Sequence, residues 1–343
     1  MQALVNYSDA PNSVELRELD KPTLKAGQVL IRVHATGVCG SDLHLWKGPV
    51  SWIVNRPIVL GHEYAGMIEA LGPGVTGWKV GQRVTGETAA EVCGVCVYCR
   101  TGNYNLCSVR KGFGALYNGS MAEYISVRQE ILHRIPEGIS FEEAAITEPA
   151  AVAFNAVFVK SKLIPGDTVV VIGPGPIGLM TLQMVRQASP ANIVMIGLSK
   201  DKARLKLAES MGADRIVCAD KEDPIPVVKE LGDRMGADLV IDAVGLRATI
   251  RQSLSMVRPN GQITKIGWDA NPYSETLDPL VAKAVTFQGS FSHTWTSWER
   301  VLSLMALKRI DTKSMISTFP VEEWEQAFSQ MDGLKTAKAV LVP

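Results

Sequence analysis

The chain has 343 residues, of which 46% are apolar, and its 35 lysines and arginines balance its 35 aspartates and glutamates. This length predicts two domains, and the balanced charge excludes the basic surface by which proteins bind nucleic acid. No apolar run reaches the roughly 18 residues of a membrane span, and residues 1–5 do not begin a signal peptide. We therefore expect a cytoplasmic protein that binds neither nucleic acid nor membrane.

The first part of the chain predicts short strands broken by turns. Residues 28–35 are rich in β-formers, residues 66–71 alternate between apolar and polar, and glycines recur from residue 61 to residue 81. This pattern is typical of a barrel-like β domain.

After about residue 165, apolar strands alternate with helical segments. The expected elements are strands at 168–172, 193–196, 215–217, 239–242 and 262–266, and helices at 177–188 and 202–211. Such alternation indicates a parallel sheet with helices on both faces. Beyond residue 290 we expect helices at 298–308 and 321–331 and a strand at 339–342, in a tail that folds back onto the first domain.

A cluster of four cysteines is the firmest metal signal. Cys93, Cys96, Cys99 and Cys107 follow one another at intervals of three, three and eight residues. One loop can thus wrap four sulfurs around an ion at about 2.3 Å each, which predicts a closed, structural zinc site. The alternatives are four buried cysteines that share no ion and an iron–sulfur centre, which also uses four thiolates.

A second constellation has the ligand types of a catalytic zinc. Cys39, Ser41 and His44 follow a predicted strand, and His62 with Glu63 comes about twenty residues later. Cysteine, histidine and carboxylate with one open position suit a metal that acts as a Lewis acid on a substrate oxygen. Glu148 is an alternative source of the carboxylate.

The strand predicted at 168–172 runs into a glycine-rich turn, and a helical segment follows. Gly173, Gly175 and Gly178 form the G-x-G-x-x-G pattern that lets a pyrophosphate approach the backbone and a helix N-terminus. The sequence therefore predicts a dinucleotide cofactor.

The end of the second predicted strand bears on the choice of cofactor. Gly197 stands where a carboxylate would bind the adenosine ribose, and Ser199, Lys200 and Arg204 offer donors to a 2′-phosphate. This pattern favours NADP over NAD. In the alternative interpretation, Asp201 binds the ribose and the basic side chains are solvated.

These motifs jointly resemble the zinc-containing medium-chain dehydrogenases, especially their sorbitol (L-iditol) and threonine dehydrogenase branch. The two zinc motifs, the four-cysteine segment and the glycine pattern occur in the family's order along essentially the whole chain. The resemblance implies an α/β protein with a GroES-like catalytic domain at 1–150, a structural zinc lobe at about 88–110, a Rossmann domain at 151–290 and a returning segment at 291–343. It also implies a homodimer or homotetramer.

The resemblance implies roles for the candidate residues. Cys39 and His62 would bind the catalytic zinc, Glu63 would be a ligand or a close neighbour active in catalysis, and Glu148 would reach the metal directly or through water. Ser41 and His44 would relay the proton. The expected cofactor contacts are Gly173, Gly175, Ile177, Gly178, Gly197, Ser199, Lys200, Arg204, Ile266 and Gly267.

The resemblance implies a dehydrogenase with two zinc ions that moves hydride from a polyol or secondary alcohol to NADP or NAD and yields a ketone. Glu148-Pro149 is similar to the polyol enzymes, whereas threonine dehydrogenases tend to have Asp-Pro there. L-threonine 3-dehydrogenase is the alternative within the class. A non-catalytic dinucleotide-binding redox sensor is the alternative from another class.

Overall fold

The computed structural model describes all 343 residues and divides them into two compact units. Unit 1 consists of Met1–Glu148, His293–Lys308 and Met315–Pro343, and unit 2 consists of Pro149–Ser292 and Arg309–Ser314. The chain leaves unit 1 within α4 (Thr147–Phe154) and returns to it at His293. It leaves again after Lys308 and returns finally within the short helix η5 (Lys313–Met315).

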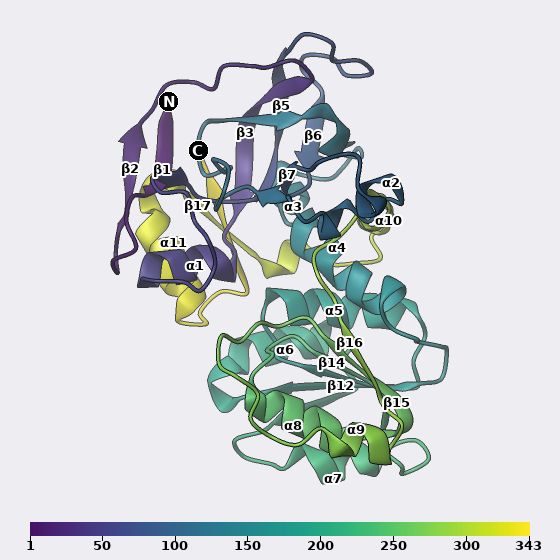
Figure 1. Ribbon diagram of the computed structural model, residues 1–343. Coiled ribbons are helices and arrows are strands. Elements are labelled where there is room, and N and C mark those ends of the chain that lie inside the picture. Colours follow the sequence, from purple (N-terminus) through teal and green to yellow (C-terminus); the bar gives the residue numbers. More distant parts are fainter. The chain divides into compact units, whose positions relative to one another are not determined.

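Unit 1 is a β domain built on a seven-stranded sheet (Figure 1). The strand order is β10-β6-β5-β3-β18-β17, and β9 also pairs with β3. These strands are β3 (Gln28–Gly37), β5 (Glu63–Leu71), β6 (Arg83–Gly86), β9 (Tyr124–Arg128), β10 (Leu132–Arg134), β17 (Ile316–Pro320) and β18 (Lys338–Val342).

Smaller elements complete unit 1. Three strands form the sheet β2-β1-β4, and β7 pairs with β8 beside the cysteine lobe. Their bounds are β1 (Gln2–Asn6), β2 (Val14–Glu18), β4 (Ile58–Val59), β7 (Ala89–Glu91) and β8 (Lys111–Gly112). The helices are α1 (Gly40–Lys47), α2 (Val97–Arg100), η1 (Tyr104–Leu106), η2 (Gln129–Ile131), α3 (Phe141–Ala145), α10 (Trp295–Ala306), η6 (Val321–Glu323) and α11 (Trp324–Asp332).

The register of the large sheet brings distant segments together. β3 runs antiparallel to β5 with Gly37 opposite Glu63, so the residues that follow β3 lie beside those that precede β5. β18 also pairs with the end of β3, where Val340 lies opposite Gly37. The chain around residues 37–39, 62–63 and 338–340 is thereby gathered at one place.

Unit 2 is a parallel six-stranded sheet in the order β13-β12-β11-β14-β15-β16. The strands are β11 (Thr168–Ile172), β12 (Asn192–Gly197), β13 (Arg215–Cys218), β14 (Ala237–Asp242), β15 (Val257–Lys265) and β16 (Thr286–Gly289). Figure 1 shows α5 and α6 on one side of the sheet and α7 and α8 on the other. The helices are η3 (Asn155–Val159), α5 (Pro176–Gln187), η4 (Ser199–Asp201), α6 (Lys202–Ser210), α7 (Pro224–Lys229), α8 (Arg247–Met256) and α9 (Asp278–Ala282).

The parallel sheet with helices on both faces confirms the α/β fold expected from the sequence. The middle residues of its central strands are apolar because both faces are covered, and Val170, Val194 and Val240 are fully buried. Seven α-helices were not expected, namely α1, α2, α3, α4, α7, α8 and α9. α7 has prolines at 224 and 226, which look like helix breakers, yet Asp223 caps this helix and Pro224 occupies its first turn. None of the helices combines the length and apolarity needed to cross a bilayer.

Candidate active site and metal centres

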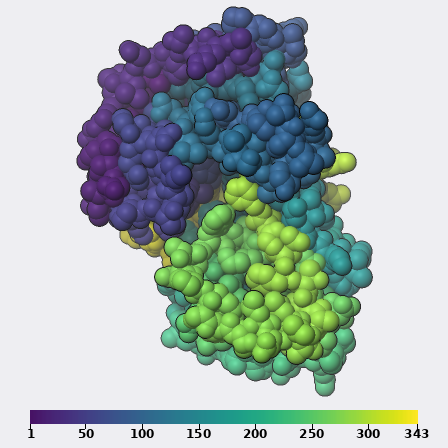
Figure 2. Space-filling view, viewed as in Figure 1, coloured from purple at the N-terminus to yellow at the C-terminus, as the bar shows by residue number.

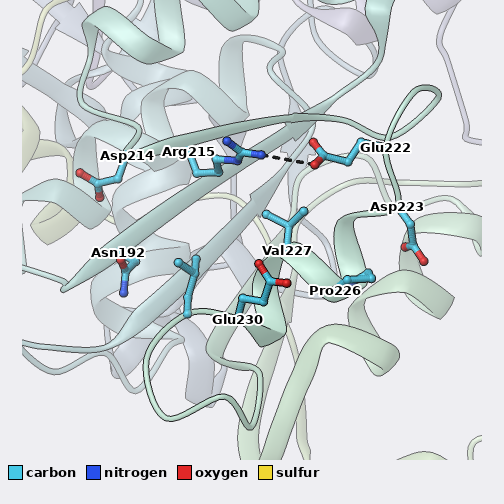
Figure 3. A pocket seen from close by; sticks show the side chains of 9 residues that line it. Asn192, Asp214, Arg215, Glu222, Asp223, Pro226, Val227 and Glu230 are labelled. Carbon is cyan, nitrogen blue, oxygen red and sulfur yellow. Dashed lines mark hydrogen bonds and ion pairs between the residues drawn. The ribbon is translucent and has the colours of Figure 1, made fainter.

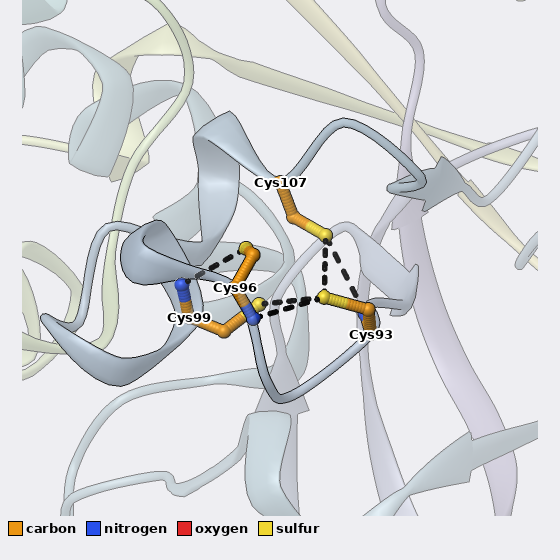
Figure 4. Close-up of side chains that lie close together, drawn as sticks. All are labelled: Cys93, Cys96, Cys99 and Cys107. Carbon is orange, nitrogen blue, oxygen red and sulfur yellow. Dashed lines mark hydrogen bonds between the residues drawn. The ribbon is translucent and has the colours of Figure 1, made fainter.

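Four cysteine sulfurs converge in the lobe that follows β7 (Figure 4). The Sγ atoms of Cys93 and Cys99 lie 3.9 Å apart, and those of Cys93 and Cys107 lie 3.6 Å apart. Cys96 caps α2, and its sulfur accepts the Cys99 N–H at 3.4 Å. A tetrahedral ion with metal–sulfur bonds of about 2.3 Å requires sulfurs about 3.8 Å apart. The four thiols therefore fit one zinc ion.

The lobe cannot be stabilised by an apolar core of its own. Val95 and Val97 are 66% and 64% exposed, and Figure 2 shows this segment, in blue, at the surface of unit 1. All four cysteines are free thiols. Backbone N–H groups of Val95 and Cys96 lower the pKa of Cys93 to about 6, whereas burial and the neighbouring sulfurs raise the pKa of Cys99 to about 12. A bound cation would therefore be needed to keep all four sulfurs as thiolates. A bound ion would thus supply the cross-link that packing does not.

A second cluster lies where β3 ends and β5 begins. The ligand atoms of Cys39, His62 and Glu63 all lie within 4.8 Å of one another. The buried Asp42 accepts the backbone N–H of Cys39 at 2.8 Å and that of Gly61 at 3.3 Å. Asp42 therefore joins the two loops that carry Cys39 and His62, a role that the sequence motif alone did not reveal.

The surroundings of His62 are strongly negative. Burial alone would lower the pKa of this imidazole, but Cys39, Asp42 and Glu148 raise it to about 10. Such an excess of acidic groups around one imidazole favours a bound cation. Glu63 Oε2 is buried and has no hydrogen-bond partner in the protein, which also fits a metal site.

The other oxygen of Glu63 is bound to a buried lysine. Lys338 Nζ lies 2.6 Å from Glu63 Oε1 and donates to the Val38 carbonyl at 2.8 Å, and both charged side chains are 1% exposed. Sequence reasoning missed Lys338 because 275 residues separate it from Glu63.

Glu148 reaches the same region from the start of α4. Its Oε1 lies 3.4 Å from His293 Nε2, and His293 Nδ1 lies 3.5 Å from Glu87 Oε2. Burial would raise the pKa of Glu148, but the hydrogen bond and charge of His293 lower it overall. The contact with His293 thus favours the ionised form of Glu148, and its Oε2 is not engaged by His293.

Glu87 is the centre of a buried polar network that sequence analysis did not identify. The Tyr104 hydroxyl donates to its two oxygens at 2.7 and 2.8 Å, and His133 Nε2 lies 3.2 Å from Oε1. His133 Nδ1 in turn lies 2.5 Å from Glu299. Two imidazoles and a phenol thus compensate one buried charge.

Ser41 and His44 lie three residues apart on α1 and so share one face of the helix. Leu43 and Leu45 of this helix are buried in the core that contains Phe328 of α11, which fixes its orientation. His44 is exposed, with its ring 6.2 Å from that of Trp52. Ser41 is half-buried.

The glycine-rich turn of unit 2 lies between β11 and α5. Gly173 has a φ of +95°, and a Cβ on Gly178 would lie 1.7 Å from the Gly173 carbonyl, so both positions need glycine. Gly175 caps α5, and the space that its Cβ would occupy is open. Ile177 lies in the first turn of this helix. The turn thus leaves backbone donors accessible to a pyrophosphate.

The other predicted cofactor residues lie at or after the carboxyl ends of two strands of the same parallel sheet, β12 and β15. Gly197 ends β12, and Ser199 and Lys200 follow it, whereas Arg204 is buried in α6 beside Asp201 rather than exposed at the strand end. Ile266 and Gly267 follow β15, and both donate backbone N–H groups to the Asp242 carbonyl, at 2.9 and 3.1 Å. The carboxyl ends of these strands are where doubly wound sheets bind their ligands.

A pocket of about 610 Å³ lies elsewhere in unit 2 (Figure 3). Its lining includes four acidic side chains among apolar and polar ones, and it contains the Arg215–Glu222 ion pair of 3.3 Å. Asn192 and Arg215 begin β12 and β13, so the pocket reaches the amino ends of these strands. It includes none of the predicted site residues, and we assign it no role in the reaction.

A dinucleotide-binding type of sheet, a four-thiolate cluster and a Cys–His–Glu cluster define a zinc-dependent dehydrogenase. Two family models agree: residues 25–137 match the alcohol dehydrogenase GroES-like domain, and residues 176–307 match the zinc-binding dehydrogenase domain. The chain belongs to the zinc-binding alcohol dehydrogenase family. This confirms the resemblance inferred from the motifs.

The individual relatives are dehydrogenases of polyols, polyol phosphates and threonine. A sorbitol dehydrogenase of Halalkalibacterium halodurans is 39% identical, covering 100% of this chain and 99% of the relative. A D-arabitol-phosphate dehydrogenase of Enterococcus avium is 40% identical, covering 92% and 89%. An L-threonine 3-dehydrogenase of Bacillus subtilis is 34% identical, covering 100% and 99%.

Solved structures share the whole fold. An alcohol dehydrogenase from Thermus sp. ATN1 has a TM-score of 0.91 and 32% identity, covering 100% of this chain and 99% of its own. A zinc-binding dehydrogenase from Sinorhizobium meliloti 1021, bound to NADP, has a TM-score of 0.90 and 26% identity, with the same coverage. The chain is thus an alcohol or polyol dehydrogenase that acts on small-molecule alcohols.

Proposed function

We propose that this chain oxidises a polyol or a related secondary alcohol to the ketone and transfers the hydride to NAD(P)⁺. The observation that carries the proposal is the convergence of the Cys39, His62 and Glu63 ligand atoms within 4.8 Å. Similarity to sorbitol and D-arabitol-phosphate dehydrogenases supports the polyol class.

Cys39, His62, Glu63 and Glu148 would hold the catalytic zinc, because Lys338 engages only Oε1 of Glu63 and leaves Oε2 without a partner. When bound, zinc supplies a Lewis acid that lowers the pKa of an alcohol hydroxyl. Lys338 would hold the charged carboxylate of Glu63 in place beside Cys39 and His62. Asp42 would hold the two loops that carry Cys39 and His62 at their spacing. The lobe of Cys93, Cys96, Cys99 and Cys107 would hold the structural zinc.

Ser41 and His44 would carry the proton away from the alcohol. Their common face on α1 suits transfer from a half-buried hydroxyl to an exposed imidazole, which then exchanges the proton with solvent. The turn from Gly173 to Gly178 and the ends of β12 and β15 would bind the nicotinamide dinucleotide, which accepts the hydride.

We further propose that the functional domains follow the expected limits of 1–150, 151–290 and 291–343. A cytoplasmic homodimer or homotetramer is the assembly that the family resemblance supports.

Initial rates of NAD(P)H formation test the function. The panel contains sorbitol, xylitol, D-arabitol, D-arabitol phosphate, 2-propanol and L-threonine, each with NAD⁺ and NADP⁺. We expect the highest rate with a polyol or its phosphate. A rate confined to L-threonine would establish the alternative that the 34% identical relative supports. Dinucleotide binding without reduction by any alcohol would instead favour the redox sensor.

A further inference from the structure

The end of β12 has no room for a side chain. A Cβ on the buried Gly197 would lie 2.9 Å from Pro174 Cγ and 2.9 Å from Leu205 Cδ2. Because Pro174 belongs to the glycine-rich turn, a larger residue here would displace that turn. The ribose-binding carboxylate common in doubly wound folds therefore cannot come from this position.

A carboxylate reaches this edge of the sheet from the next strand. β13 pairs with β12 so that Gly197 lies opposite Cys218, and Asp220 follows two residues later. Asp220 Oδ1 accepts the Ser199 N–H at 2.7 Å, and its Oδ2 accepts the Ser199 hydroxyl. The exposed Asp220 is thus bound to the residue that lies two positions after Gly197.

The donors expected to attract a 2′-phosphate are largely engaged. Both donors of Ser199 are bound to Asp220. Arg204 is 6% exposed and lies beside Asp201, whose Oδ2 accepts the Leu198 N–H at 2.9 Å within the turn. Lys200, Lys202 and Lys221, which follows Asp220 directly, remain exposed here as cationic side chains.

We propose that Asp220 binds the adenosine ribose of the cofactor in place of the missing carboxylate on β12 and makes the chain prefer NAD to NADP. This inference rests on the proposed function, and it reverses the preference expected from Gly197 alone. Each Asp220 oxygen keeps a lone pair with which to accept a ribose hydroxyl, and the hydrogen bonds from Ser199 lower the pKa of Asp220 and keep it ionised. A 2′-phosphate would instead bring further negative charge to a carboxylate.

Direct binding tests the inference without turnover. The fluorescence of NADH and of NADPH is titrated with the zinc-loaded protein. We expect NADH to bind the wild-type chain about tenfold more tightly or better. Asp220→Asn should weaken the binding of NADH about tenfold, because a charge-assisted hydrogen bond is lost. It should leave the binding of NADPH unchanged or make it tighter.

Two matched variants separate this role from a general effect. Asp220→Glu retains the charge and should retain the preference for NADH. Glu209→Gln removes an exposed carboxylate from α6 and should change neither affinity. Circular dichroism checks that each variant is folded.

NADPH binding to the wild-type chain as tightly as NADH would overturn the inference, as would an equal loss of both affinities in Asp220→Asn. If neither NADH nor NADPH bound the wild-type chain, the result would contradict the proposed function itself, and the inference with it.

Discussion

Replacement of Lys338 by methionine should destabilise the protein strongly. The ammonium group lies 2.6 Å from Glu63 and 2.8 Å from the Val38 carbonyl, and both charged side chains are 1% exposed. The variant leaves the Glu63 carboxylate and the Val38 carbonyl buried without their partner, which lowers the free energy of unfolding by about 3–5 kcal/mol. For a unit of this size, that loss lowers the midpoint of thermal unfolding by about 6–20 °C.

Thermal unfolding of the zinc-loaded protein measures this effect. Lys111→Met is the matched control, because Lys111 pairs with Glu91 at 2.9 Å but both side chains are 43% exposed. Solvent screens that pair, so the control should unfold close to the wild-type temperature. The double variant Lys338→Met/Glu63→Gln should recover part of the loss, since no carboxylate then remains unpaired. Equal midpoints for Lys338→Met and Lys111→Met would refute the reasoning.

Three further predictions concern the other polar sites. Cys96→Ser should reduce the zinc content from two ions to one per chain in native mass spectrometry, and an unchanged mass would contradict the structural site. Asp42→Ala should weaken the catalytic zinc about 10–100-fold in a chelator competition, because the loops of Cys39 and Gly61 lose their common partner; wild-type affinity would show that Asp42 is dispensable. Burial raises the pKa of Glu87, but His133 and His293 lower it to about 2. Its stabilising effect is therefore complete above about pH 4.5 and is lost as the pH falls towards 2, so Glu87→Gln should unfold with a smaller dependence on pH over this range in urea titrations. The same pH dependence as in the wild-type chain would argue against a buried charge at Glu87.

Features encoded by local spacing could be predicted from the sequence. The four cysteines of the lobe lie within 15 residues, so their spacing alone suggested one ion. The glycine pattern was informative because an apolar strand precedes it and a helix follows it, and β11 has the expected bounds of 168–172.

Features encoded by long-range packing could not be predicted. Lys338 reaches Glu63 only because β18 pairs with β3, and His293 reaches Glu148 from α10's preceding loop. Asp220 lies beside Ser199 only because β13 pairs with β12 in one register. Such contacts depend on the topology of the sheets, so the residue pattern of a single segment cannot predict them.

The central claim is that a zinc ion held by Cys39 and His62 carries the alcohol chemistry. The most direct test is the rate of NAD(P)H formation by Cys39→Ser with the best polyol substrate, with zinc counted in the same preparation. We predict one zinc ion per chain, unchanged dinucleotide binding and no measurable turnover. Full activity with one zinc ion, or wild-type activity after removal of all zinc, would contradict the account.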